Sequence, residues 1–355
     1  MERNTFDFTR EIEQCASLDI DWSKIDHKSL LITGATGMVG RFPIEVLLYR
    51  NAHNNADIKV FAVGRNEEKF RRRFEGLTGS DQLVFVKADV QEPIQLTHSL
   101  DYIVHMASNT HPRLYASDPI GTEMSNILGT YYLLNLASSN KNCRFVFTSS
   151  GDVYGDNRSG KPLLDEKDCG YIDCNTLRAG YIEGKRASEA LCNAYKEAKG
   201  IDFVTARLCR IYGPTMQLEE SKAISQFIER SARGEDIILK SKGTQRFSYL
   251  YIYDAVTALL YIMTAGETGE AYNVADNEQT CSLLELAKML SGIAGTSIKY
   301  DNPDQLEKKG ASTFQDVCLD STKLMQTGWK PMVEMEEGLK NTVNHIRNIM
   351  QKPDK

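Results

Sequence analysis

The stretch SLLITGATGMVGRFPIEVLLYRN, residues 29–51, decides the fold. Its first residues are an apolar run typical of a buried strand, and they lead into Gly34, Gly37 and Gly40. A helical pattern follows directly. Glycines at such a strand-to-helix turn let backbone N–H groups approach a pyrophosphate at the N-terminus of the helix. The stretch therefore predicts a dinucleotide-binding loop, and the alternative is a tight turn made only for packing.

Five further apolar strands follow along the chain, separated by helical segments. They lie within residues 57–65, 82–90, 100–108, 143–155 and 200–214. Continuous apolar strands that alternate with helices are typical of a parallel sheet covered on both faces. The predicted fold class is therefore α/β, a doubly wound parallel sheet of the Rossmann type, with a smaller C-terminal lobe.

The pattern loosens after Pro214, which indicates a second unit. We expect a dinucleotide-binding domain over residues 28–209, which the chain rejoins at about 247–263. Residues 210–246 and 264–355 are expected to form most of a substrate-binding lobe. Residues 1–27 are expected to be an amphipathic leader, for which no function is predicted.

The composition limits the class of protein. The 355 residues are 41% hydrophobic and 25% charged, which is ordinary for a globular protein. A formal net charge of −6 offers no general attraction to nucleic acid or to anionic membranes. The chain has no run of 18 apolar residues that would predict a membrane-spanning helix, and its N-terminus lacks the apolar run of a signal peptide. Neither nucleic acid nor a membrane is therefore an expected partner.

The eight cysteines are scattered, mostly within apolar runs. This usage indicates reduced thiols and a cytoplasmic protein. Cys169 and Cys174 are the closest pair, but no second pair with zinc spacing accompanies them, so we expect no metal site.

The end of the second predicted strand bears on the choice of cofactor. A carboxylate is expected there when the ribose carries a free 2′-hydroxyl, but this chain has Gly64 followed by Arg65. Arg65 is placed to meet a 2′-phosphate instead, so the cofactor is expected to be NAD or NADP. For most of the arginine run at 71–73, a solvated helix face is the favoured interpretation. Asp89 and Val90, which end the third strand, are placed to contact the adenine.

The segment AGYIEGKRASEA, residues 179–190, puts Tyr181 and Lys185 one turn apart on a predicted helix. A fixed ammonium and a nicotinamide cation are expected to lower the pKa of the phenol from about 10 toward neutrality, which would make it a base. Ser150, at the end of the fifth strand, is placed to hydrogen-bond the same substrate oxygen. The alternative is a solvated helix face with a snorkelling lysine.

Together with the glycine loop, the run TSSGDVYG (148–155) and the Tyr181-x-x-x-Lys185 pair resemble the extended short-chain dehydrogenase/reductases, the NAD-dependent epimerase/dehydratase family. The likeness covers nearly the whole chain, from about Lys28 to Gly338. Later landmarks are RIYGP (210–214), QRFSYLYIYDAV (245–256) and LDSTKLMQTGWKP (319–331).

Within that superfamily the chain is most similar to the UDP-glucuronate decarboxylases. The segments HMASNTHPRLYASDPIGTEMSNILGT (105–130) and RAGYIEGKR (178–186) carry this resemblance. The chain also departs from the pattern: Ser150-Gly151-Asp152 stands where the decarboxylases have Thr-Ser-Glu, and Arg210 replaces an Asn before the Tyr-Gly-Pro step.

The resemblance implies an enzyme that oxidises C4 of a nucleotide sugar with a bound nicotinamide cofactor. A UDP-glucuronate decarboxylase-like reaction is the leading expectation. A C4 epimerase and a 4-ketosugar reductase are the alternatives among enzymes, and a non-enzymatic dinucleotide sensor is a fourth possibility. A homodimer built on the helices after the first and fourth strands is also implied by the resemblance.

Each candidate residue has an expected role. Tyr181, Lys185 and Ser150 are the expected catalytic residues, together with Asp152 as an acid or water-positioning group at C5; a turn-capping aspartate is the alternative for Asp152. Guanidinium groups suit a diphosphate or a carboxylate, so substrate binding is expected from Arg210 and Arg246. The expected cofactor contacts are Gly34, Thr36, Gly37, Met38, Val39, Gly40, Arg65, Asp89, Val90, Ala107, Tyr181 and Lys185.

Overall fold

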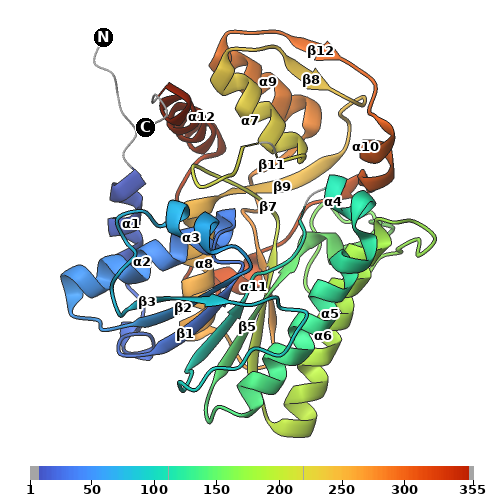
Figure 1. Ribbon diagram of the computed structural model, residues 1–355. Coiled ribbons are helices and arrows are strands. Elements are labelled where there is room, and N and C mark those ends of the chain that lie inside the picture. Colours follow the sequence, from blue (N-terminus) through green and yellow to red (C-terminus); the bar gives the residue numbers. More distant parts are fainter. Residues whose placement is uncertain (1–7, 111, 219, 352–355) are drawn as a thin grey trace.

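The computed structural model describes residues 8–110, 112–218 and 220–351. A parallel sheet with the strand order β10-β6-β5-β4-β1-β2-β3 lies at its centre (Figure 1). The strands are β1 (Ser29–Thr33), β2 (Lys59–Gly64), β3 (Leu83–Lys87), β4 (Tyr102–His105), β5 (Arg144–Ser150), β6 (Asp202–Leu208) and β10 (Ala271–Val274). The order reverses beside β1, which pairs with both β2 and β4. The prediction of a doubly wound parallel sheet is confirmed.

Helices cover both faces of this sheet because its strands are apolar on both sides. One face carries α5 (Pro119–Ser138) and α6 (Ala179–Lys199), and the other carries α2 (Met38–Asn54) and α8 (Ile252–Ala265) (Figure 1). The helix α3 (Glu67–Arg73) follows β2. The helix α8 is buried along nearly its whole length, but its 14 residues are too few to span a bilayer. Among the helices that the structure describes, none is long and apolar enough to cross a membrane.

A smaller lobe lies beyond the carboxyl ends of the central strands (Figure 1). It contains α7 (Ala223–Arg233) and α9 (Leu283–Ala294) beside a pair of parallel strands, β8 (Ile237–Leu239) and β12 (Ile298–Tyr300). A second small sheet joins β7 (Arg210–Tyr212), β9 (Arg246–Tyr251), β11 (Thr280–Ser282) and β13 (Asp316–Val317). The remaining helices are α4 (Pro112–Ser117), α10 (Gln305–Gly310), α11 (Thr322–Met325) and α12 (Met335–Gln351), with short turns of helix at Trp22–Lys24 and Gly151–Tyr154.

The segment 247–263 forms β9 and α8. The helix α8 packs against β6 and β10 of the central sheet, whereas β9 pairs with β7, β11 and β13. The seventh central strand is β10, from a segment that the sequence pattern assigned to the lobe.

The segment before β1 is part of the hydrophobic core rather than a separate leader. Its helix α1 (Phe8–Ala16) packs on α2 and α8, and the Phe8 ring lies 4.8 Å from that of Phe42. The buried Glu11 carboxylate accepts hydrogen bonds from the Tyr251 hydroxyl at 2.9 and 3.1 Å. Burial raises the pKa of Glu11 to about 8. Residues 1–7 of the predicted leader lie outside the described residues.

Candidate active site

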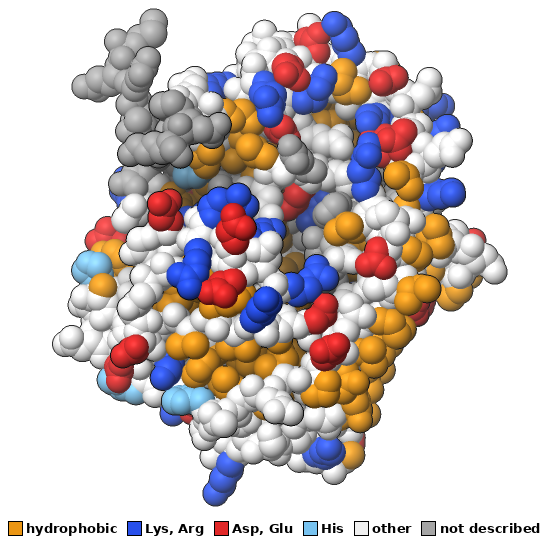
Figure 2. All heavy atoms as spheres, viewed as in Figure 1, with side chains coloured by type: hydrophobic (Ala, Val, Ile, Leu, Met, Phe, Trp, Pro, Cys, Tyr) orange, Lys and Arg blue, Asp and Glu red, His pale blue; other side chains and the backbone are white. Residues whose placement is uncertain are grey.

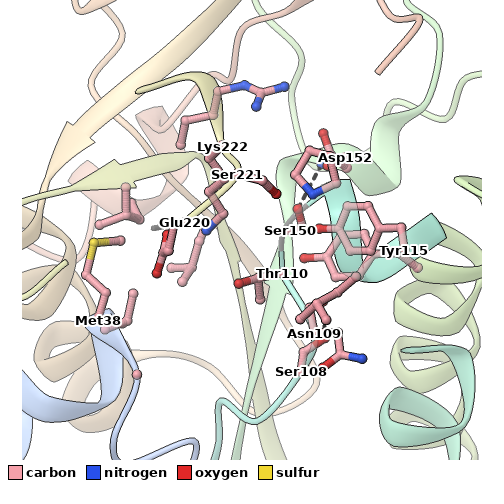
Figure 3. Close-up of a pocket in the computed structure, with 18 of the residues that line it drawn as sticks. Met38, Ser108, Asn109, Thr110, Tyr115, Ser150, Asp152, Glu220, Ser221 and Lys222 are labelled. Carbon is pink, nitrogen blue, oxygen red and sulfur yellow. Dashed lines mark hydrogen bonds between the residues drawn. The ribbon is translucent and has the colours of Figure 1, made fainter. Parts of the chain in front are cut away.

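A cleft of about 790 Å³ opens at the carboxyl ends of the central strands, where the strand order reverses. Ligands of doubly wound sheets bind at this position, because the loops there diverge to opposite faces. The walls come from the ends of β1 to β6 on one side and from the loop before α7 on the other (Figure 3).

The glycine loop forms one end of this cleft, and its geometry requires glycine. Gly34 has a φ of +68°, and a Cβ there would lie 2.8 Å from the carbonyl oxygen of Met106. A Cβ on Gly40 would lie 2.3 Å from the carbonyl oxygen of Gly34. Gly37 is the N-cap of α2, so the free N–H groups of the first helical turn face the cleft. This is a built cradle for a pyrophosphate.

All the residues expected to contact the cofactor line the cleft. At the end of β2, the Arg65 side chain is 72% exposed, with its Nη1 3.7 Å from Oδ2 of Asp89. Lys69 of α3 lines the same end, which the sequence did not predict. Arg73 does not lie on a solvated helix face, which was the interpretation favoured for most of residues 71–73. Its guanidinium donates a hydrogen bond to the Thr215 carbonyl oxygen, and burial lowers the pKa of Arg73 to about 10.

The predicted catalytic residues meet at the other end of the cleft. Tyr181 is 6% exposed, and its phenol lies close enough to the Ser150 side chain for Ser150 to influence its pKa. The Ser150 hydroxyl accepts a hydrogen bond of 3.1 Å from the backbone N–H of Asp152. One turn along α6 from Tyr181, the Lys185 ammonium donates to the Thr148 carbonyl oxygen at 2.7 Å. Strand β5 and helix α6 thus hold the serine, tyrosine and lysine together.

The pKa of the phenol differs from the sequence-based expectation. Burial, followed by the charge of Asp152, raises the pKa of Tyr181 to about 12. Ser150 and the charges of Arg178 and Arg210 act to lower this pKa, but burial outweighs them. Burial also lowers the pKa of Lys185 to about 7. The expectation that Lys185 lowers the pKa of the tyrosine is therefore wrong for the protein's own groups. The lysine is buried and directed at a backbone carbonyl, so its charge is itself disfavoured.

One further aromatic ring and an arginine complete this end, and sequence reasoning did not assign them. Arg178, at the start of α6, forms an ion pair with Asp152. Its guanidinium lies 4.5 Å from the ring centroid of Tyr115, and the Tyr115 ring stacks on Tyr181 at 4.8 Å. Figure 3 shows Tyr115, Ser150 and Asp152 gathered on one wall. Arg178 could have been predicted from its position three residues before Tyr181. Tyr115 comes from a distant segment, and no local spacing indicates it.

Of the two arginines expected to bind substrate, one lines the cleft and the other does not. Arg210 lines the cleft, with its guanidinium 3.6 Å from the ring centroid of Phe247. Arg246 is not among the described residues that line the cleft; it is exposed and lies 3.4 Å from Glu285. Successive side chains of a strand point to opposite faces. Because Phe247 faces the cleft, its neighbour Arg246 faces away, and that prediction is not supported.

The model of the NAD dependent epimerase/dehydratase family matches residues 30–275. The chain belongs to this family. The epimerase/dehydratase match takes in almost all of the central sheet, from the second residue of β1 to the residue after β10. It leaves out α1 and the elements after β10.

Similar proteins are found among sequences and among solved structures. UDP-glucuronic acid decarboxylase 1 of Xenopus tropicalis is 29% identical over 329 residues, which are 93% of this chain and 74% of that protein. UDP-glucuronic acid decarboxylase 3 of Arabidopsis thaliana is 28% identical over 313 residues, 87% of this chain and 86% of that one. The structure of UDP-glucuronic acid 4-epimerase from Bacillus cereus, in complex with UDP-glucuronic acid and NAD, aligns with a TM-score of 0.75. That alignment covers 90% of this chain and 99% of the epimerase at 20% identity, so it bears on the fold alone.

Proposed function

We propose that this member of the epimerase/dehydratase family oxidises C4 of a nucleotide sugar and decarboxylates UDP-glucuronate. The observation that carries the proposal is the meeting of Tyr181, Ser150, Lys185 and Asp152 at one end of a cleft whose other end is the glycine loop. The similarity to UDP-glucuronic acid decarboxylases, about 28% identical over most of the chain, supports the choice of substrate.

The residues present fit a nicotinamide dinucleotide. The backbone packs so closely at Gly34 and Gly40 that neither position has room for a side chain, as in a glycine turn that presents backbone N–H groups to a pyrophosphate. Asp89 and Val90 would hold the adenine end, and Tyr181 and Lys185 the nicotinamide ribose. Such a cofactor supplies a reversible hydride acceptor, which lets a sugar alcohol pass through a ketone and back.

In the proposed reaction Tyr181 takes the proton of the C4 hydroxyl, and Ser150 hydrogen-bonds the same oxygen. Loss of hydrogen from C4 gives a 4-keto sugar, in which the C5 carboxylate is β to a ketone. The C5–carboxylate bond then breaks, CO2 leaves, and its electron pair remains as an enolate. Protonation at C5 and return of hydrogen to C4 give the pentose. Asp152, held by Arg178, is proposed to orient a proton or water at C5.

The proposal is tested by incubating the holoprotein with UDP-glucuronate and following CO2 and product mass. We expect CO2 release and a UDP-pentose without net consumption of NAD, because the hydrogen removed from C4 is returned there. An unchanged mass with inverted C4 would reject decarboxylation in favour of C4 epimerisation. A reaction that proceeds only with added reduced cofactor would favour the reductase.

We propose that the cofactor site also accepts NADP. Gly64 provides no carboxylate at the end of β2, and the cations Arg65 and Lys69 line the cleft there. We expect Arg65→Ala to weaken NADP binding about 10-fold while leaving NAD within about 2-fold, because only NADP carries the 2′-phosphate that the guanidinium would contact. Calorimetric titration of both cofactors measures this, and an unchanged NADP affinity would exclude the contact.

The homodimer also remains a proposal, on one of the two helices expected. The helix after the first strand, α2, is covered by α1 and α8. The helix α5, which comes after the fourth strand, exposes Ile120 and Tyr131, and hydrophobic side chains gather over it in Figure 2. A second copy packed on this face would cover them, and the molar mass in solution tests this.

The cytoplasmic location is likewise a proposal. It is supported by the eight cysteines, all of which are free thiols in the described structure.

A further inference from the structure

Two cations in the cleft form no ion pair with any described residue. Arg210 belongs to β7, and its Nε is buried without a hydrogen-bond partner. Lys222 is the N-cap of α7, where burial lowers the pKa of its ammonium. Within the described residues, neither side chain forms a hydrogen bond or an ion pair. An uncompensated cation in a partly enclosed site is costly unless a ligand supplies the opposite charge.

The neighbouring arginine differs in this respect. The charge of Arg178 is already compensated by Asp152, and its guanidinium lies against the Tyr115 ring. Arg210 also has its guanidinium against a ring, that of Phe247, but no carboxylate accompanies it. Arg210 and Lys222 are therefore cations at this end of the cleft that no described carboxylate pairs with.

Both cations lie at the catalytic end. The charge of Arg210 acts on the Tyr181 phenol, and the charges of Glu220 and Asp152 both act on the Lys222 ammonium. Figure 3 shows Ser221 and Lys222 across the pocket from Ser150 and Asp152. An anion bound between the two cations would thus lie beside the sugar carbon whose hydroxyl meets Tyr181.

We propose that Arg210 and Lys222 form a carboxylate subsite that selects sugars with an acidic group at C5. The inference rests on the proposed function, because it takes C4 of a nucleotide sugar to lie at Tyr181. A C5 carboxylate is attached to the carbon next to C4, so it reaches the same end of the cleft as the reacting hydroxyl. A planar guanidinium and a mobile ammonium suit the two oxygens of such a group.

The subsite acts on binding more than on turnover. The carboxylate leaves as neutral CO2, so the two cations stabilise the bound substrate more than the transition state for its loss. Substituting them is expected to raise KM for UDP-glucuronate while changing kcat less.

The test compares UDP-glucuronate with UDP-glucose, which differ only in the carboxylate at C5. Binding is measured by calorimetry with NAD-loaded protein in a Tyr181→Phe background, so that neither ligand reacts. Arg210→Met and Lys222→Met are each expected to weaken UDP-glucuronate about 10-fold and to leave UDP-glucose within about 2-fold. Arg233→Met is the matched control, because Arg233 is exposed at the far end of α7 and paired with Glu229.

The outcomes separate the subsite from the proposed reaction. Equal weakening of both ligands would assign the cations to the diphosphate and overturn the subsite, even if wild-type protein decarboxylates UDP-glucuronate. No preference of the unsubstituted cleft for the carboxylate would overturn it as well. A preference that depends on Arg210 and Lys222, in a protein that releases no CO2, would uphold the subsite and reject the proposed reaction.

Discussion

Tyr181→Phe is expected to lower turnover at least 10³-fold while leaving cofactor and nucleotide-sugar binding within about 3-fold of wild type. The substitution removes only the hydroxyl that is proposed to take the C4 proton. The ring is buried and stacks on Tyr115 at 4.8 Å, and a phenylalanine preserves this packing. Steady-state turnover and calorimetric affinities for NAD and UDP-glucuronate measure the two halves of the expectation.

Tyr300→Phe is the matched control for loss of a phenol hydroxyl. Tyr300 lies on β12, is largely exposed and does not line the cleft. Undiminished turnover in Tyr181→Phe would reject the base assignment. A loss of turnover accompanied by a loss of binding would place the role of the hydroxyl in binding instead.

Glu11→Gln is expected to stabilise the protein at and above neutral pH, by an amount that grows from pH 5 to pH 9. Burial raises the pKa of Glu11 from 4.5 to about 8, so the unfolded chain loses its proton at lower pH than the folded one. Below pH 4.5 the buried carboxyl therefore costs the wild type no stability from ionisation. Its free energy of unfolding falls as the pH rises from about 4.5 to about 8. At about 1.4 kcal/mol per pKa unit, the upper limit of the difference is about 5 kcal/mol.

The substitution by glutamine removes only the ionisation of Glu11 and leaves its other interactions in place. Its side-chain oxygen can still accept the hydrogen bond from Tyr251, and Asp254 and Glu337, whose charges also raise the pKa of Glu11, remain in both proteins. Free energies of unfolding from urea titrations at pH 5, 7 and 9 give the difference directly. Parallel pH dependence in the two proteins would mean that Glu11 titrates normally in the fold.

Motifs predicted the parts of the site that lie close together in sequence. Gly34, Gly37 and Gly40 are fixed by one turn, and Tyr181 and Lys185 by one helical repeat, so local spacing was enough to find them. Arg178 was within reach of the same reasoning, since it lies one turn before Tyr181. Tyr115 comes from α4 and Lys222 from the start of α7, and only the tertiary packing of these distant segments brings both to the cleft.

Two failures have a common physical cause, namely that burial cannot be read from a motif. The pKa of Tyr181 moves upward because the phenol is desolvated, although a nearby lysine suggested the reverse. Arg246 was assigned to the substrate because of its type, but β9 alternates and directs it outward.

The packing of α1 means that the family boundary and the folding boundary do not coincide. The family match begins at Leu30, yet Cys15, Ala16 and Ile25 are fully buried before it. Arg50, within the matched region, donates to the carbonyl oxygen of Ala16 and pairs with Asp26 at 2.7 Å. A chain trimmed to the matched residues would expose an apolar surface on α2 and α8. It would also leave Arg50 without its ion-pair partner Asp26. Recombinant fragments, domain swaps between relatives and fusion junctions should therefore keep α1 with the catalytic unit.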